Sequence, residues 1–428
     1  MNIVNTNNFE KVTLDNGLRI ILTPLASVRS VCAIVLCGAG SRYETEETNG
    51  ISHFLEHMFF KGTKRRPTAS DISHALDAIG AEYNAFTGKE TTGYHIKSAS
   101  EHLSLVCDML ADMVWNSKFD EAEIEKERGV IIEEINLYED TPMRRVGEIY
   151  EGLLWQNQPL GWDIGGRKEV IRKLTRADFL KYIGERYAPN NMVVSISGDF
   201  RRDKVLSDLK KHFGAKKPHG VSGFTKAFED QKKPAMKVVY KDTDQAHLVL
   251  GVRGIHLTHP DRYNAAILGT ILGGGMSSRL FLNVREKRGL AYYVRADNES
   301  YLDTGTFCAS AGVDLQRIDD AIKVILSEFK KITQEKVNDK ELKKTKEYIK
   351  GRLVLSWEDS RTAAFMYGTD ELLEGKVNPL DEELKEVDKV EASDVQRVAK
   401  SLFIEKKLNL AVIGPFKEAS KFEKVLKL

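Results

Sequence analysis

The chain of 428 residues is long enough for two to four domains, and its 42% hydrophobic and 30% charged residues are typical of a globular protein. Its 64 basic and 63 acidic residues leave a net charge of +1, which gives no support to nucleic acid as a partner. The polar start lacks a signal or transit-peptide pattern, and the longest apolar run, VCAIVLCGAG, is too short to span a bilayer. Four cysteines without a CxxC pair predict buried free thiols. We therefore expect no membrane attachment and a cytoplasmic location.

The first half of the chain mixes strand and helix patterns that do not alternate one to one. The expected strands are 18–22, 31–36, the segments YNAFT and TGYHIK around a GKE turn, and NMVVSIS; the expected helices are 51–60, 70–79, 100–115 and 121–138. This order predicts an α+β fold in which helices pack on a mostly antiparallel sheet.

The second half repeats the first. Residues 216 positions apart match without a gap, and a further match, EINLYEDT with LVLSWEDS, lies 219 apart. The matched pairs include Asp178 with Asp394, Tyr187 with Phe403, Gly198 with Gly414 and Phe200 with Phe416. The sequence therefore predicts two homologous domains, 1–213 and 235–428. The Lys-, Gly- and Pro-rich stretch 214–234 is expected to be a linker.

The stretch HFLEH carries two histidines four residues apart. On a helix, His53 and His57 stand one turn apart on the same face, with Glu56 beside them. Two neutral imidazoles at this spacing can share a Zn²⁺ ion, and H-x-x-E-H is a known zinc-peptidase motif. The pattern alone leaves open a helix that carries these polar residues by chance. A hydrolytic site also needs a third ligand and an open position for water.

A second acidic pattern lies in KERGVIIEEINLYED, where Glu127 and Glu134 are two helical turns apart on one face and Glu133 points elsewhere. Two carboxylates among apolar residues such as Val130, Ile131 and Leu137 need a reason. A metal ligand and a partner that orients a ligand histidine would supply one. The alternative is a solvated acidic face.

The repeat offers an internal control. In the second half, the positions of His53, Glu56, His57 and Glu134 are occupied by Gly269, Leu272, Gly273 and Leu353. If these polar residues served only the fold, both copies should contain them. The comparison indicates that they are functional additions to the first domain and that the second domain is metal-free.

With these motifs, the chain resembles the pitrilysin/insulinase peptidase family, in the short two-domain form related to the mitochondrial processing peptidase. The resemblance covers nearly the whole chain and includes three further segments: GSRYETEETNGISHFLEHMFFKGT, NAFTGKETTGYH and GGGMSSRLFLNVREKRGLAYYV. It implies that each chain forms half of a clamshell. It also implies a zinc metalloendopeptidase that hydrolyses peptide bonds in unstructured peptides or precursor segments.

The resemblance also implies roles for individual residues. One Zn²⁺ per chain would be held by His53, His57 and Glu134, with Glu56 as general base and Glu127 as the acid behind the ligands. Arg285 and Tyr292 match a pair that stabilises substrate and transition state. Asn84, Ala85 and Phe86 match the strand that receives the substrate. Local alternatives are a salt bridge between Arg285 and Glu286, and an interior hairpin strand at 83–87.

The family's chamber needs two such two-domain units, and this chain supplies one. We therefore expect a homodimer in which Arg285 and Tyr292 serve the partner's zinc, with peptides as substrates. A non-catalytic assembly subunit and one half of a heterodimer are the alternatives. The presence of both motifs in one chain argues against each of them. Only Gly273–Gly275 stand where the processing peptidase's non-catalytic subunit has a long Gly-rich loop, so presequence specificity is not implied.

Overall fold

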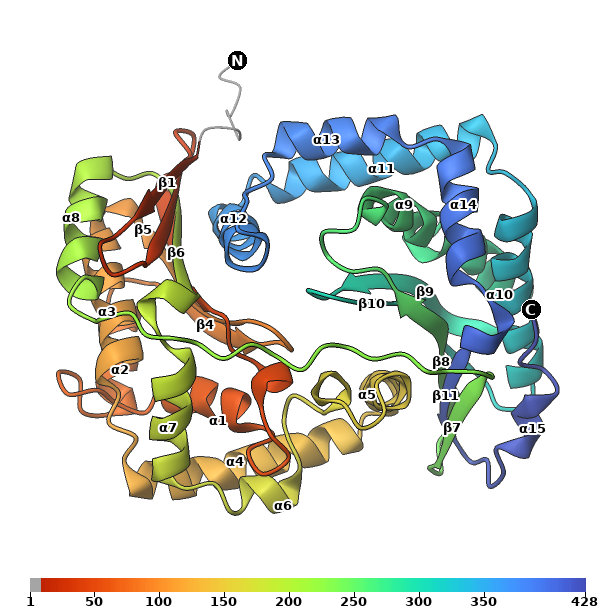
Figure 1. Ribbon diagram of the computed structural model, residues 1–428, viewed down its shortest axis with the longest axis horizontal. Helices are drawn as coiled ribbons and strands as arrows, with labels where there is room; N and C mark the ends of the chain where they lie inside the picture. Colours follow the sequence, from red (N-terminus) through yellow and green to blue (C-terminus); the bar gives the residue numbers. More distant parts are fainter. Residues whose placement is uncertain (1–8) are drawn as a thin grey trace. The chain divides into compact units, whose positions relative to one another are not determined.

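The computed structural model describes residues 9–428, which form two compact units, each built on one β-sheet (Figure 1). Unit 1 takes the described residues up to 135, together with 162–225 and 353–382. Unit 2 takes 136–161, 226–352 and 383–428. The predicted α+β class, with helices on mostly antiparallel sheets, is confirmed.

Unit 1 has a six-stranded sheet of order β1-β2-β6-β3-β5-β4, in which only β2 and β6 pair in parallel. Its strands are β1 (Glu10–Thr13), β2 (Arg19–Pro24), β3 (Ser30–Cys37), β4 (Glu82–Thr87), β5 (Thr92–Ala99) and β6 (Met192–Gly198). Its helices are α1 (Ile51–Met58), α2 (Ala69–Asp77), α3 (Leu103–Asn116), α4 (Glu121–Glu139, which ends in unit 2), α6 (Lys168–Ile171), α7 (Arg176–Arg186), α8 (Arg202–Phe213) and α12 (Ser360–Glu374).

Unit 2 has a five-stranded sheet of order β7-β11-β8-β10-β9, in which only β7 and β11 are parallel. Its strands are β7 (Ala235–Tyr240), β8 (Gln245–Gly254), β9 (Ala291–Ser300), β10 (Gly305–Asp314) and β11 (Asn409–Gly414). Its helices are α5 (Pro142–Leu154), α9 (Arg262–Gly273), a π-helix (Phe281–Glu286), α10 (Ile318–Gln334), α11 (Asp339–Ser356, which ends in unit 1), α13 (Leu380–Lys389, which begins in unit 1), α14 (Ala392–Leu402) and α15 (Ser420–Glu423).

The repeat seen in the sequence reappears in the strand register. Arg19 pairs with Val193 between β2 and β6, and Ala235 pairs with Asn409 between β7 and β11. The second pair lies 216 positions after the first. One edge differs, because β1 covers the outer edge of β2, whereas no strand among residues 9–428 covers the equivalent edge of β7.

The compact units exchange segments between the two halves of the sequence. Helix α12, from the second half, packs on β3 and β6 in unit 1, and α5, from the first half, packs on β8 and β11 in unit 2. Lys97 pairs with Asp359 at 2.8 Å at the start of α12, and Lys11 pairs with the buried Glu371 at 2.7 Å. Each sheet therefore has a helix from the other half on one face, and the boundaries at 213 and 235 stay a prediction about the repeat.

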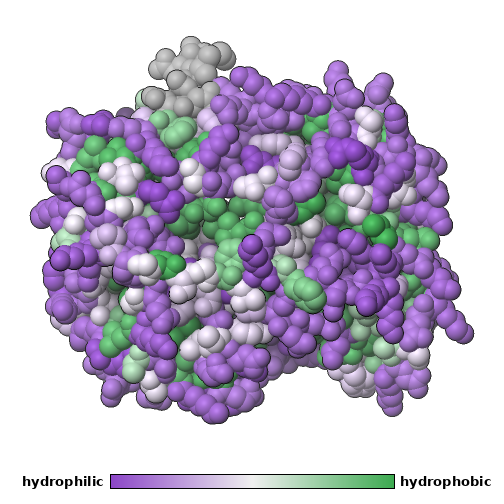
Figure 2. Space-filling view, in the orientation of Figure 1, coloured by the Kyte–Doolittle hydropathy of each residue, from purple (hydrophilic) through white to green (hydrophobic). Residues whose placement is uncertain are grey.

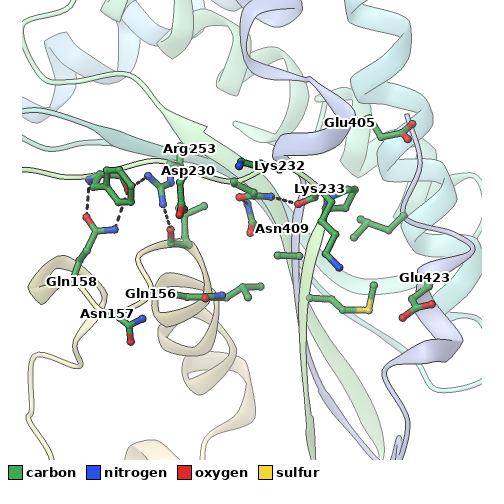
Figure 3. Close-up of a pocket in the computed structure, with 18 of the residues that line it drawn as sticks. Gln156, Asn157, Gln158, Asp230, Lys232, Lys233, Arg253, Glu405, Asn409 and Glu423 are labelled. Atoms are coloured by element: carbon green, nitrogen blue, oxygen red, sulfur yellow. Dashed lines mark hydrogen bonds between the residues drawn. The ribbon is translucent and has the colours of Figure 1, made fainter.

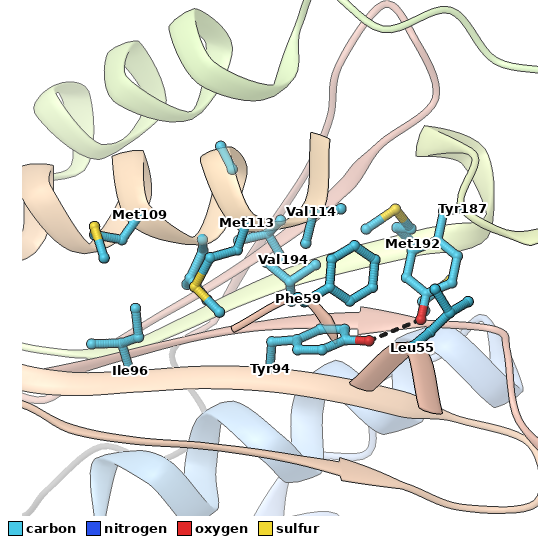
Figure 4. Close-up of a cluster of buried hydrophobic side chains, with 14 of the residues drawn as sticks. Leu55, Phe59, Tyr94, Ile96, Met109, Met113, Val114, Tyr187, Met192 and Val194 are labelled. Atoms are coloured by element: carbon cyan, nitrogen blue, oxygen red, sulfur yellow. Dashed lines mark hydrogen bonds between the residues drawn. The ribbon is translucent and has the colours of Figure 1, made fainter. Parts of the chain in front are cut away.

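The core of unit 1 lies between its sheet and helices α1 and α3. Leu55 and Phe59 pack there with Tyr94, whose hydroxyl bonds that of Tyr187 at 2.9 Å (Figure 4). The four cysteines are buried and free, as predicted. Hydrophilic side chains cover most of the face seen in Figure 2. Among the described helices, none is both long and apolar enough to cross a membrane.

Candidate active site

Helix α1 is fixed so that its polar residues turn away from the core. Gly50 precedes it with φ of 95°, and Glu44 accepts hydrogen bonds from the backbone N–H groups of Gly50 at 2.7 Å and Ser52 at 2.9 Å. These bonds satisfy donors that a helix start leaves unpaired. Phe54 and Leu55 are fully buried. With 3.6 residues per turn, the partly exposed residues of HFLEH then share the opposite side.

The structure brings the three predicted ligands together. The Nε2 atoms of His53 and His57 lie 3.3 Å apart, and Oε2 of Glu134 on α4 lies 3.6 Å from the first and 3.5 Å from the second. Three donors at about 2.0–2.1 Å from a tetrahedral Zn²⁺ ion stand about 3.3 Å from one another. The observed triangle therefore fits a zinc ion. Among residues 9–428, no other group of histidine, cysteine and acidic side chains is close enough to hold a metal.

Glu127 lies behind the ligands, as the sequence predicts. Its Oε1 is 2.8 Å from Nδ1 of His57, and its Oε2 is 2.5 Å from Nζ of Lys61. A hydrogen bond at Nδ1 fixes the ring and leaves Nε2 for a metal. Glu127 is only 5% exposed, which excludes a solvated acidic face there.

The apolar setting expected for α4 is correct only in part. Ile131 is fully buried, but Val130 and Leu137 are 51% and 62% exposed. The prediction placed all three beside the inward carboxylates, and it is wrong for Val130 and Leu137. The helix buries one narrow stripe, and these two side chains lie outside it.

The acidic neighbours change the protonation of His57. Burial acts to lower its pKa, but the hydrogen bonds and charges of Glu127 and Glu134 prevail and raise the pKa to about 9. Hydrogen bonds from His57 and Lys61 outweigh the effect of burial and hold the pKa of Glu127 below its ordinary value. Because metal binding requires a neutral imidazole, a cation and the His57 proton compete for this site.

Glu56 stands beside the cluster without belonging to it. The Thr87 hydroxyl, at the end of β4, donates a hydrogen bond to its Oε2. Burial raises the pKa of Glu56, and the charge of Glu134 raises it further. The hydrogen bond from Thr87 and the charge of His57 lower this pKa, but the net shift is upward. A carboxylate with a raised pKa is a better proton acceptor in general base catalysis near neutral pH.

The predicted substrate strand is an edge strand. β4 pairs with β5 on one side, and no strand of the described chain pairs with its other side. The alternative of an interior hairpin strand is therefore excluded. Asn84 is exposed, Ala85 packs against the core, and the Phe86 ring lies 5.4 Å from that of Phe365 on α12. Their role in substrate binding stays a prediction.

Arg285 and Tyr292 lie in unit 2, at the π-helix and at the edge strand β9. The Arg285 guanidinium carbon is 5.6 Å from the centre of the Tyr292 ring and 4.8 Å from that of Phe281. Tyr292 is 73% exposed. The salt bridge between Arg285 and Glu286 is 4.0 Å long and both side chains are exposed, so it restrains the guanidinium only weakly.

A cavity of about 960 Å³ lies in unit 2, beside the start of β7 and the end of α5 (Figure 3). None of the predicted site residues lines it. Its charged lining residues are Asp230, Lys232, Lys233, Arg253, Glu405, Glu423 and Lys427. Both signs of charge are present without histidine or cysteine, so the lining favours neither a metal nor one class of ion.

Comparison with protein families gives two matches. The family described as insulinase (peptidase family M16) matches residues 19–167, and the one described as the peptidase M16 inactive domain matches 173–349. An uncharacterized zinc protease of Bacillus subtilis is 39% identical over 407 residues, which are 95% of this chain and 98% of that protein. An uncharacterized zinc protease of Streptomyces coelicolor is 35% identical, over 95% of this chain and 90% of its own length.

Solved structures share the fold. A protease from Helicobacter pylori matches with a TM-score of 0.89 and 26% identity, over 96% of this chain and 100% of its own. A chain of complex III2 from Candida albicans matches with a TM-score of 0.85 over 98% and 100% of the two chains. At 19% identity, that second likeness concerns the fold alone.

Proposed function

This chain belongs to the insulinase family, peptidase family M16, and we propose that it is a zinc-dependent endopeptidase acting on unstructured peptides or precursor segments. The triangle of His53, His57 and Glu134 donors carries the proposal, because its edges of 3.3–3.6 Å fit one Zn²⁺ ion. The relatives named as zinc proteases match along nearly their whole length.

The chemistry follows from the residues around this triangle. When bound, zinc supplies a Lewis acid that acidifies a water molecule and polarises the scissile carbonyl. Glu56 takes the proton from the attacking water and passes it to the leaving amine. Tyr292 donates a hydrogen bond to the developing oxyanion, and Arg285 orients Tyr292 or the substrate backbone.

We assign substrate binding to the free edge of β4. A peptide that adds to this edge as a further strand is held by backbone hydrogen bonds, which give affinity with little side-chain preference. Asn84, Ala85 and Phe86 lie on this edge. Only an extended, unfolded segment can pair in this way, which supports unstructured peptides as the substrate class.

The proposal includes a homodimer. The zinc ligands belong to unit 1, and Arg285 and Tyr292 belong to unit 2. Two copies would each offer their Arg285 and Tyr292 to the zinc of the partner. Mixing inactive Glu56→Gln with inactive Tyr292→Phe then restores activity, because one of the two sites becomes complete. Verified subunit exchange without recovery contradicts the shared site, as does a fully active monomer in light scattering.

A non-catalytic assembly subunit is the second candidate. The match to an M16 inactive domain and the fold shared with a complex III2 chain favour it. That match, however, begins at residue 173 and leaves out the whole zinc cluster, which lies in the insulinase match at 19–167. A complete donor set with its base favours the peptidase.

The deciding experiment compares wild type with Glu56→Gln on a mixed library of quenched fluorescent peptides about ten residues long, chosen to fit an extended strand. Bound zinc is measured in both proteins. We expect wild type to cleave, and the variant to hold the same zinc while its rate falls by about 10²–10⁴-fold. Zinc binding with no cleavage by wild type of any peptide in the library favours the assembly subunit. Failure to retain supplied zinc rejects the metal site itself.

A further inference from the structure

Thr87 is the last residue of β4 and connects the proposed substrate strand with the proposed base. Its hydroxyl donates to Oε2 of Glu56, and among residues 9–428 it is the one hydrogen-bond donor to this carboxylate. We propose that Thr87 is a positioning residue, which aims the Glu56 carboxylate at the attacking water. This inference rests on the proposed peptidase function.

The end of β4 is well suited to this role because it is held in place from several directions. In the turn after Thr87, the carbonyl oxygen of Gly88 accepts a hydrogen bond from the backbone N–H of Ser41 at 3.3 Å. The carbonyl oxygen of Lys89 accepts one from the backbone N–H of Arg42 at 2.9 Å. The Lys89 ammonium donates to the carbonyl of Trp162 at 2.6 Å. A catalytic group is aimed accurately only when its support is itself fixed, and this turn supplies that support.

Close backbone contact makes the turn still more rigid. A Cβ added to Gly40 would lie 2.4 Å from the carbonyl oxygen of Gly88, so the segment before Ser41 lies directly against the turn. The buried Arg42 also bonds the carboxylate of Glu90 in the same turn. Thr87 is therefore attached to a part of unit 1 with little freedom to move.

The hydrogen bond selects one orientation of the base. A glutamate side chain has several rotatable bonds, and without a partner its carboxylate would sample many positions. With Oε2 held by Thr87, Oε1 remains available to take a proton. Since Glu56 directly precedes His57 on α1, this orientation is set next to the zinc triangle.

The same bond links substrate binding to catalysis. A peptide added to the edge of β4 lies along a strand whose last side chain holds the base. Loss of the Thr87 hydroxyl removes no backbone group of β4, so it should leave peptide binding intact. A positioning role therefore predicts a lower kcat with little change in KM, whereas a role in strand pairing predicts a higher KM.

The test measures kcat, KM, bound zinc and the urea midpoint of Thr87→Val and Thr87→Ser. Removing a hydrogen bond to a charged acceptor should lower kcat of the valine variant by about 10- to 100-fold, with KM within about twofold of wild type. The serine variant keeps the hydroxyl and should stay within about threefold of wild type in kcat. Bound zinc should be unchanged in both variants.

Thr92→Val is the matched control. Thr92 pairs directly with Thr87 across β4 and β5, but its hydroxyl donates to the carbonyl of Ala39 at 3.1 Å. Like Thr87→Val, this change replaces a threonine of the hairpin by valine. It removes a buried hydrogen bond that does not involve the base, so it should lower the urea midpoint while leaving kcat unchanged.

The outcomes separate this inference from the proposed function. If wild type cleaves, Glu56→Gln does not, and Thr87→Val keeps the wild-type kcat, only the positioning role is overturned. Equal losses of kcat in the serine and valine variants, or in Thr92→Val, also overturn it, because they indicate a structural effect. If wild type does not cleave at all, the proposed function and this inference fail together.

Discussion

The hydrogen bond between Glu127 and His57 makes a quantitative prediction about metal affinity. Glu127→Gln keeps the size of the side chain but removes the charge that faces His57 at 2.8 Å and Lys61 at 2.5 Å. Loss of such a partner behind a metal ligand weakens metal binding by about 10- to 100-fold. That range corresponds to about 1.4–2.8 kcal/mol of binding free energy.

The loss of zinc affinity in Glu127→Gln depends on pH, and the pKa of His57 determines whether this loss grows or shrinks as the pH rises. In the wild type this pKa is about 9, so a proton competes with zinc at neutral pH. Between pH 7 and 8.5 the protonated fraction of His57 falls and proton competition weakens, so the apparent affinity should rise by about 20- to 25-fold. Without the Glu127 charge the pKa of His57 is lower, so the variant should gain less. The difference between the two proteins is therefore larger at pH 8.5 than at pH 7.

The assay is competition for zinc against a chromophoric chelator in a zinc-buffered solution, performed at both pH values. Glu133→Gln is the matched control, because Glu133 is an exposed acid on the same helix. We expect the control to bind zinc like the wild type. A Glu127→Gln protein that binds zinc within about twofold of wild type at both pH values would refute the reasoning, since loss of the partner behind a metal ligand should weaken zinc binding at least about tenfold.

Three further predictions concern stability. Although burial acts to raise it, hydrogen bonds from neighbouring side chains hold the pKa of Asp112 below its ordinary value. The contribution of Asp112 to the free energy of unfolding is therefore present above the unfolded pKa of about 3.9 and is lost as the pH falls through the folded pKa. We expect Asp112→Asn to lower the free energy of unfolding in urea by about 2 kcal/mol at pH 7 and by less in acid. A Cβ on Gly368 of α12 would lie 2.6 Å from a buried leucine methyl group, so Gly368→Ala should lower the free energy of unfolding by about 1–3 kcal/mol. Gly351→Ala on α11 is the control and should not destabilise the protein, because a Cβ there would have no atom within 4 Å. Gly273→His should destabilise unit 2 and bind no second zinc ion, because a Cβ there would lie 1.9 Å from a backbone nitrogen of β9; equal thermal midpoints for wild type and variant would contradict this.

The sequence could predict the site where the site is local in the chain. His53, Glu56 and His57 lie within two helical turns, and the 3.6-residue period placed them on one side of a helix that the structure contains as α1. Glu127 and Glu134 followed from the same period on α4. The helical period does not show that these two acids approach the histidines. For Glu134 the missing counterpart in the second half gave further evidence, and for Glu127 the family resemblance did.

Thr87 and Lys61 were missed for a physical reason. Thr87 is 31 residues from Glu56, and nothing in a strand pattern says which side chain its last residue meets. Lys61 follows α1 in a basic run that is typical of a solvated loop. Both contacts are tertiary, so they depend on how α1, β4 and α4 pack, which periodicity does not determine.

The exchange of α5 and α12 between units was also beyond the sequence. An amphipathic pattern indicates that one face of a helix is buried, but it does not name the sheet that covers that face. Short connections usually keep consecutive elements together, and both helices depart from that tendency. Their placement is decided by contacts distant in the chain, such as Lys97 with Asp359.

The packing of the second repeat explains why it has no metal site. α9 is the equivalent of α1, and its Gly273 stands where His57 stands in the first repeat. Gly273 lies so close to Ala296 of β9 that any side chain there would collide with the backbone. In unit 1 the space between α1 and β4 is instead wide enough for the Glu56 side chain to meet Thr87, and His57 meets Glu134 on α4. The zinc cluster therefore requires two features together, the polar residues and the separation of the helix from the edge strand, and the second repeat has neither.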